Sequence, residues 1–192
     1  MKVLLVDNHD SFTFNLAQLI EQCGITGLKI VKVSHLNLDE AESFRKIIIS
    51  PGPGLPKDYP DLFRLLKLYS GSKSILGVCL GHQAIAEFYG ARLMNLNSVF
   101  HGVPKKVRIL REDYLFRNVP DGFEAGLYHS WAVSDENLPS EIAVTSRADD
   151  GIIMSISHVL LDIKGVQFHP ESIMTKTGIH LMRNWLEHEQ SA

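Results

Sequence analysis

The sequence predicts an α/β fold with a central, mostly parallel sheet, helices on both faces and an antiparallel extension. In the first half, short apolar runs alternate with amphipathic stretches of helical spacing, the pattern of a parallel sheet. After Gly90, strand-like runs follow one another with few helices between them, which indicates antiparallel strands. No internal repeat, low-complexity tract or linker interrupts the 192 residues, so we expect a single domain over residues 1–192.

The first half contains four apolar runs that we expect as buried parallel strands. They are residues 3–6, 28–33, 46–50 and 75–78. Helices are expected between and after them: one that carries residues 14–20, one at 39–44, one at 60–69 and one around residues 82–86. Asp10 or Ser11 is placed to cap the first of these helices, and Gly24 and Gly90 to end the first and the last.

The second half supplies the antiparallel extension. We expect its strands at residues 92–94, 106–110, 124–128, 142–146, 152–156 and 159–168. Ser157 and His158 are expected to form a tight hairpin turn before the last strand. Apolar residues at helical spacing then predict a closing helix over residues 176–188.

Composition excludes several classes of protein. Charged residues make up 21% of the chain and the net charge is −3, so neither nucleic acid nor an anionic membrane is an expected partner. No apolar run approaches the ~20 residues of a membrane-spanning helix, and the first run stops at Asp7, too soon for a signal peptide. Two cysteines give neither a disulfide framework nor a zinc-site spacing, so we expect a cytoplasmic protein without a metal.

One of the two cysteines stands where an apolar run ends, in the sequence I-L-G-V-C-L-G-H-Q at residues 75–83. The G-x-C-x-G spacing around Cys79 is typical of a nucleophile elbow, a tight turn between a strand and a helix. The dipole of the following helix would favour the thiolate, which is the reactive form. The alternative is a buried structural cysteine at a strand end. Cys23, which stands before Gly24 at a probable helix end, is interpreted as structural.

A base for Cys79 is expected at His169, which ends the run G-V-Q-F and precedes Pro170 and Glu171. A His-x-Glu sequence at a strand end can place an imidazole and a carboxylate side by side, so that Glu171 orients His169. The alternative is an ordinary helix start with Glu171 or Ser172 as its cap. His82 is nearer to Cys79 in sequence, but on the elbow helix it should turn away from the sulfur.

The loop P-G-P-G-L-P at residues 51–56 is stiff, because it holds three prolines in six residues. A thiolate that attacks a carbonyl creates an oxyanion, which needs fixed N–H donors. Leu80 supplies one donor by the geometry of an elbow, and Gly52 or Gly54 the other, since Pro53 has no N–H. We favour Gly52. The alternative is that this loop is only a rigid connection.

Four motifs together resemble the class I glutamine amidotransferases. They are D-N-H-D-S-F-T-F-N-L at 7–16, S-P-G-P-G at 50–54, G-V-C-L-G-H-Q at 77–83 and F-H-P-E-S at 168–172. The first is similar to the glutaminase subunits of anthranilate synthase and aminodeoxychorismate synthase. The resemblance covers nearly the whole chain and implies a flavodoxin-like glutaminase domain that uses no cofactor.

The resemblance also implies roles for individual residues. Cys79 would attack the side-chain amide of L-glutamine, His169 would serve as base and then acid, and Glu171 would orient His169. Water would hydrolyse the resulting thioester. The implied glutamine-binding residues are Gly52, Pro53, Gly54, Gln83, Ser130 and Trp131. Trp131 stands where relatives commonly have leucine, which matters little if the backbone makes the contact, and simple packing is the alternative. The role of His101 stays open.

The ammonia that this reaction releases must be used by a partner. Free ammonia would mostly be protonated at neutral pH and would no longer be a nucleophile. The resemblance implies a chorismate-binding synthase subunit in a hetero-oligomer. Three alternatives remain: a glutaminase serving another synthase, such as one making GMP or imidazole glycerol phosphate; a cysteine peptidase or thiol protein on a related fold; and a non-catalytic regulatory subunit. The opening motif argues against the first, the His-x-Glu sequence with the Pro-Gly loop against the second, and the complete set Cys79, His169 and Glu171 against the third.

Overall fold

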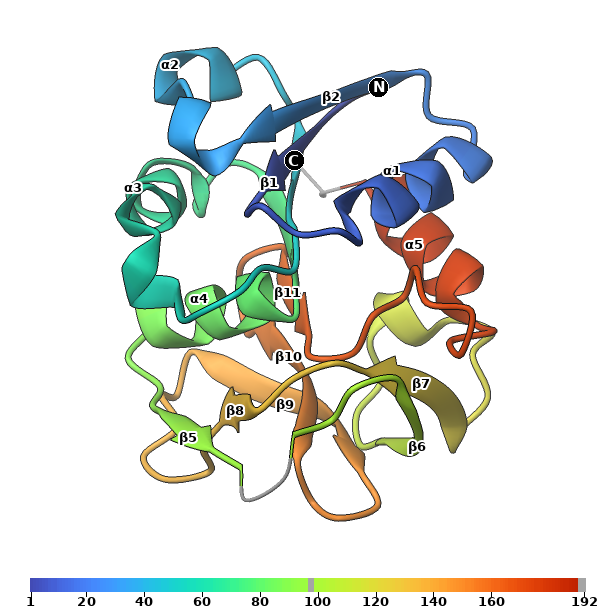
Figure 1. Ribbon diagram of the computed structural model, residues 1–192. Helices are drawn as coiled ribbons and strands as arrows, with labels where there is room; N and C mark the ends of the chain where they lie inside the picture. The colour runs from blue at the N-terminus through green and yellow to red at the C-terminus, as the bar shows by residue number, and fades with distance from the viewer. Residues whose placement is uncertain (97–98, 190–192) are drawn as a thin grey trace.

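A nine-stranded sheet forms the centre of the computed structural model, which describes residues 1–96 and 99–189 (Figure 1). Its strands lie in the order β2-β1-β3-β4-β11-β10-β9-β6-β7. The parallel half consists of β2 (Gly27–Lys32), β1 (Lys2–Asp7), β3 (Lys46–Ile49), β4 (Ser74–Val78) and β11 (Ile163–Val166). The antiparallel half consists of β10 (Ile153–His158), β9 (Ile142–Ala148), β6 (Val103–Ile109) and β7 (Phe123–Leu127). This arrangement confirms the predicted fold class.

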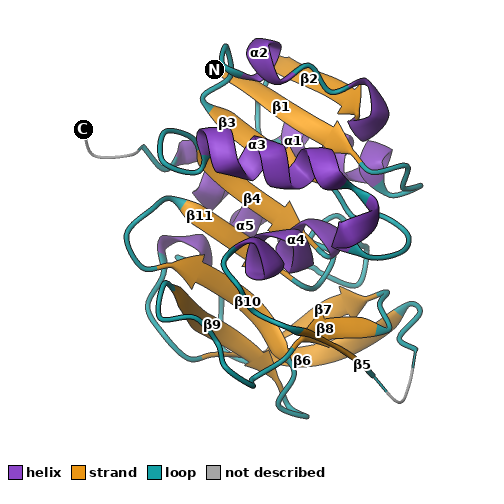
Figure 2. Cartoon of the chain, turned by 90° about the vertical axis from the view of Figure 1, so that its left-hand side faces the viewer, coloured by secondary structure: helices purple, strands orange, loops and turns teal. Residues whose placement is uncertain are grey.

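Helices cover both faces of the parallel half. Figure 2 shows α3 (Pro60–Tyr69) and α4 (Leu80–Phe88) in front of the sheet, with α1 (Thr13–Gln22) and α5 (Gly178–Glu187) behind it. Successive side chains of β1 divide between the two layers: Val3 and Leu5 pack with α1 and α5, whereas Leu4 and Val6 pack with α3. A strand buried on both faces must be apolar throughout, which is why these strands read as unbroken apolar runs.

The chain order of the strands positions the site. β11 lies between β4 and β10, parallel to the first and antiparallel to the second. The carboxyl ends of β3, β4 and β11 therefore meet at one edge of the sheet, where sites form in open α/β folds. No helix among the residues described is long and apolar enough to cross a membrane.

Several local expectations were wrong. The hairpin turn does not lie at Ser157 and His158, which are the last residues of β10, and the connection follows them. His158 Nδ1 accepts the N–H groups of Leu160 and Leu161, both at 3.0 Å, and so shapes that connection. As a result β11 begins only at Ile163, and the strand expected over 159–168 is much shorter.

The start of α1 and the strand expected at 92–94 also differ. The N-cap of α1 is Phe12, so no side chain caps this helix. Asp10 does not cap it, because Asp10 Oδ1 accepts from the N–H of Phe12, the residue before the helix. Strand β5 (Leu93–Asn95) does not extend the main sheet, because it pairs with β8 (Trp131–Val133) in a separate two-stranded sheet. The short helix α2 (Leu38–Ala41) begins one residue before the expected start and is capped by Asn37.

Candidate active site

Cys79 joins the end of β4 to the start of α4 in a strained conformation. Its backbone has φ 51° and ψ −100°, a region that residues with a Cβ rarely adopt. The turn is held on both sides, because Cys79 N–H donates to Val166 O at 2.8 Å and Gln83 N–H donates to Cys79 O at 3.1 Å. The first hydrogen bond ties the elbow to the end of β11. Only 6% of the Cys79 surface is exposed.

Gly77 and Gly81 flank Cys79 in the elbow, and neither position has room for a Cβ atom. A Cβ on Gly77 would lie 2.3 Å from the Gly81 carbonyl carbon, and a Cβ on Gly81 would lie 2.3 Å from Ile49 O. Such distances are far below van der Waals contact, and the facing atoms are backbone atoms that cannot turn aside. The elbow therefore requires glycine at both positions so that α4 can pack directly on β4 and β3.

His169 and Glu171 form a buried pair just beyond β11. His169 Nδ1 lies 2.6 Å from Glu171 Oε1, and their side chains are 2% and 0% exposed. Because a carboxylate only accepts, Nδ1 carries the proton of this hydrogen bond, and Nε2 is left for another contact. The backbone fixes the pair: His169 N–H donates to Gly126 O at 3.0 Å, and Thr175 Oγ1 donates to His169 O at 2.7 Å.

The pKa of the His169 imidazolium is raised by its neighbours. Burial alone would lower the pKa of this ring, but hydrogen bonding and charge at Cys79 and Glu171 outweigh burial and raise it to about 10. Nε2 is buried and makes no full hydrogen bond, although the sulfur is close enough to affect the ring. Contacts of this kind often tighten only when substrate binds.

Two aromatic rings enclose His169, and sequence reasoning missed both. The ring centroid of Phe12 lies 5.3 Å from that of His169 and the centroid of Tyr128 lies 4.9 Å away, both edge-on. Phe12 comes from the segment before α1, and Tyr128 from the segment after β7. Only the opening motif, through its resemblance, could have pointed to Phe12, because its contact with His169 is long-range.

The Pro-Gly loop is held against the elbow. A Cβ on Gly52 would lie 2.6 Å from Leu80 Cδ2 and 2.7 Å from Asn8 Cβ, so Gly52 allows this close approach. Asn8 Nδ2 donates to Ser50 O at 2.8 Å, which fixes the start of the loop. Leu80 is the first residue of α4, where N–H groups have no acceptor within the helix.

A cavity of about 200 Å³ lies between the elbow and the Pro-Gly loop, and His169 and Glu171 are not among the residues that line it. It is lined by Gly52, Pro53, Gly54, Cys79, Leu80, Gln83, Val99, Phe100, His101, Tyr128, His129, Ser130 and Trp131. All the residues expected to bind substrate or to donate to an oxyanion are in this lining, and His101, whose role was open, is also in it. A cavity of this volume suits a small molecule.

The amide of Gln83 and the ring of His129 hold one backbone carbonyl at the rim of this cavity. Gln83 Nε2 donates to Trp131 O at 2.8 Å, and His129 Nδ1 donates to the same oxygen at 2.9 Å. Burial lowers the pKa of His129 to about 4, so its ring is neutral at physiological pH. The conformation of the Ser130–Trp131 backbone is therefore fixed from two sides.

Two residues stand apart from the chemistry. His82 is fully buried on α4, against Gly165, and does not line the cavity. Cys23 is half-buried at the end of α1, where burial raises the pKa of its thiol. Among the described residues there is no group of three or more His, Cys, Asp and Glu side chains that could hold a metal ion.

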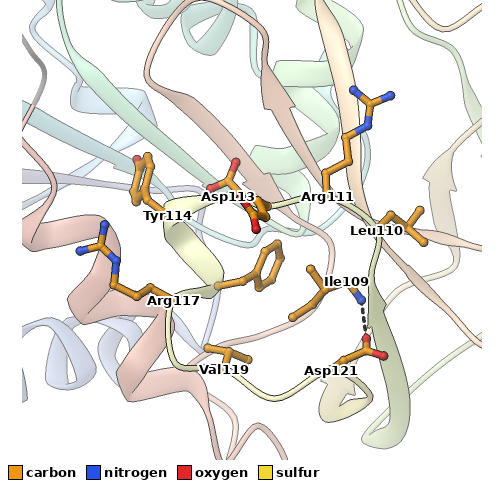
Figure 3. Close-up of a pocket in the computed structure, with 10 residues that line it drawn as sticks. Ile109, Leu110, Arg111, Asp113, Tyr114, Arg117, Val119 and Asp121 are labelled. Atoms are coloured by element: carbon orange, nitrogen blue, oxygen red, sulfur yellow. Dashed lines mark hydrogen bonds between the residues drawn. The ribbon is translucent and has the colours of Figure 1, made fainter.

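A second, wider hollow of about 790 Å³ lies over the segment between β6 and β7 (Figure 3). Its floor includes Ile109 and Val119, and Ile109 N–H donates to Asp121 Oδ1 at 2.8 Å. The guanidinium groups of Arg111 and Arg117 lie apart rather than forming one anion clamp (Figure 3). No cysteine, serine or histidine lines this hollow, so the smaller cavity at Cys79 is the candidate active site.

Comparisons with known proteins agree with this geometry. Residues 4–188 match the family "Glutamine amidotransferase class-I". A Haemophilus influenzae protein, named as a candidate anthranilate synthase component II, is 45% identical over 97% of this chain and 96% of its own. The aminodeoxychorismate/anthranilate synthase component 2 of Bacillus subtilis is 38% identical over 96% of this chain and 95% of its own.

A solved structure shows the same fold. The crystal structure of a glutamine amidotransferase from Thermotoga maritima has a TM-score of 0.80 and covers 97% of this chain and 96% of its own. At 17% identity this similarity speaks for the fold alone. The family match spans the elbow, the loop and the His-x-Glu segment of this chain, and the two relatives align over nearly the full length of both chains. The chain belongs to the class I glutamine amidotransferase family.

Proposed function

We propose that this chain is the glutaminase component of a synthase that aminates chorismate. The observation that carries the proposal is the buried His169–Glu171 pair, 2.6 Å apart, beside a cysteine on a strained elbow at a small cavity. The names of the relatives, anthranilate or aminodeoxychorismate synthase component 2, support the choice of chorismate as the acceptor. The cytoplasm is where we place this activity.

The reaction begins with L-glutamine in the cavity, held by backbone groups of Gly52, Gly54, Ser130 and Trp131, with Pro53 shaping the loop. Both amide hydrogens of Gln83 are donated within the protein, so its oxygen is the atom left to accept from substrate. The Cys79 thiolate attacks the side-chain carboxamide carbon, and the N–H groups of Leu80 and Gly52 stabilise the oxyanion.

Proton transfer by His169 completes both halves of the reaction. Protonated His169 gives its proton to the departing nitrogen, the C–N bond breaks, and ammonia leaves a glutamyl thioester on Cys79. Neutral His169 then takes a proton from water, and the water oxygen bonds to the carbonyl carbon of the thioester. The C–S bond breaks, which releases glutamate and returns the Cys79 thiolate. Glu171 keeps Nδ1 protonated throughout, so that Nε2 is the nitrogen that exchanges the proton.

The partner is a chorismate-binding subunit, which receives the ammonia before the ammonia reaches bulk water and is protonated. We infer that the isolated chain is a weak glutaminase and that the partner raises its turnover. The same geometry could serve another synthase, and a product assay with the partner purified from cells decides between anthranilate and aminodeoxychorismate.

The test uses Cys79→Ala in the complex with the partner. Synthesis from glutamine should be lost, whereas synthesis from added ammonium should continue at the wild-type rate, because the acceptor site lies on the other subunit. Loss of both activities would mean that Cys79 is structural, and the proposal would fail. A glutamine-like chloroketone should label the wild-type chain at Cys79, and a peptidase would ignore it.

A further inference from the structure

Gln167 is a buried amide beside the nucleophile that the reaction above does not use. It follows β11 directly, and none of its surface is exposed. Its backbone N–H donates to Met154 O at 2.9 Å, which fixes its place at the end of the sheet. Its side-chain Nε2 lies 3.6 Å from Cys79 Sγ, a hydrogen-bond distance for the larger sulfur atom. The sulfur therefore has an amide neighbour as well as an imidazole.

The direction of this hydrogen bond follows from a chain of three contacts. The carbonyl of Trp131 can only accept, so the Gln83 atom that lies 2.8 Å from it must be the nitrogen. The same nitrogen lies 3.1 Å from Gln167, whose facing atom must then be the oxygen. The other end of the Gln167 amide, the one near Cys79, is therefore the N–H donor.

We propose that Gln167 is a positioning residue for the Cys79 thiolate. An N–H donor stabilises the negatively charged sulfur more than the neutral thiol, and it also limits rotation of the Cys79 side chain. The donor is itself held by Gln83 and, through Gln83, by the Trp131 carbonyl. The backbone that would bind glutamine is thus connected to the nucleophile by hydrogen bonds. This inference rests on the proposed glutaminase function.

The experiment compares Gln167→Met with the wild-type chain. Methionine keeps the length and the unbranched shape of glutamine but has no N–H group. The rate of Cys79 alkylation by iodoacetamide is measured from pH 5 to 9, with mass spectrometry separating Cys79 from Cys23. The loss of one hydrogen bond to a charged group should lower the alkylation rate on the acid side about tenfold and move the profile to higher pH. Glutaminase kcat should fall about tenfold with a smaller change in KM, since the substrate contacts remain.

Two further variants separate positioning from mere stability. Gln167→Glu puts a carboxylate beside the thiolate and should move the alkylation profile further in the same direction. Thr145→Val removes a buried hydrogen bond to Ser155 in the same sheet but leaves the side-chain contacts of Cys79 and Gln167 in place, so it should lower the melting temperature and leave the profile unchanged. Co-purification of each variant with the partner subunit, together with its circular dichroism spectrum, reports that the variant is folded.

Profiles of Gln167→Met and Gln167→Glu that superimpose on the wild type would overturn the inference. A shift of the Thr145→Val profile equal to theirs would also overturn it, because the effect would then be one of stability. A wild-type chain that does not hydrolyse glutamine in the complex would contradict the proposed function instead, whatever the Gln167 variants do.

Discussion

His82 offers a test of how burial controls a titrating group in this protein. Its ring is 0% exposed, and neither nitrogen makes a full hydrogen bond within the described part of the chain. Burial lowers the pKa of the ring from 6.5 to about 3, an effect that the Gly165 backbone partly offsets and the nearby His129 reinforces. The perturbation is His82→Met, which replaces the ring with an apolar side chain of similar volume.

The expected magnitude follows from proton linkage. Between pH 6.5 and pH 3 the unfolded chain binds a proton at His82 and the folded chain does not, so stability from this group is present above pH 6.5 and is lost as the pH falls. At 1.36 kcal/mol per pKa unit, His82 costs the folded state about 2 kcal/mol at pH 5 relative to pH 8. His129 and His169 titrate in both proteins, so the difference between wild type and variant isolates His82.

The assay is urea unfolding of both proteins at pH 5 and at pH 8. The free energy of unfolding of His82→Met should exceed that of the wild type by about 2 kcal/mol more at pH 5 than at pH 8. Glutaminase turnover should be unchanged, because His82 is outside the cavity. The control is an exposed side chain that does not titrate, and Phe14→Met should give the same difference at both pH values. An equal effect of His82→Met at the two pH values would refute the reasoning.

Two further predictions concern close packing and buried charge. Gly81→Ala should destabilise the chain by at least ~1–3 kcal/mol, because its Cβ would meet Ile49 O at 2.3 Å, whereas Gly71→Ala, with open space around it, should change the melting temperature little. Thermal unfolding compares the two, and equal effects would contradict the packing argument. Asp113 and Lys164 form a buried ion pair at 2.7 Å, so Asp113→Ala should lower the free energy of unfolding by about 3–5 kcal/mol in a urea titration. A loss below about 1 kcal/mol, typical of surface pairs, would contradict this prediction.

Much of the fold could be predicted because the parallel strands are buried on both faces. Unbroken apolar runs marked β1 and β3, and the helix expected at 60–69 coincides with α3. The candidate site followed from the same logic, since residues after neighbouring strands had to share an edge of the sheet. The side-chain contacts that complete the site could not be predicted from the apolar pattern of the strands.

What could not be predicted depends on contacts between distant or single groups. β8 has three residues and pairs outside the main sheet, so it leaves no periodic signal. The connection after β10 is set by one acceptor, His158 Nδ1, which two backbone N–H groups share. Gln167 looked like one polar residue in an apolar run, and its meaning depends on Cys79 and Gln83, which are close to it only in three dimensions.

The place of β11 in the sheet has a consequence for the newborn protein. A ribosome makes β4, the strand that leads into Cys79, long before β11, the strand that brings His169 and Glu171 to its side. Until then no strand pairs with β4 on that side, and the His169–Glu171 pair does not yet lie beside Cys79. Under the proposed function, a nascent chain therefore carries the Cys79 thiol without the base that the reaction needs, and glutamine hydrolysis begins only once β11 has joined the sheet.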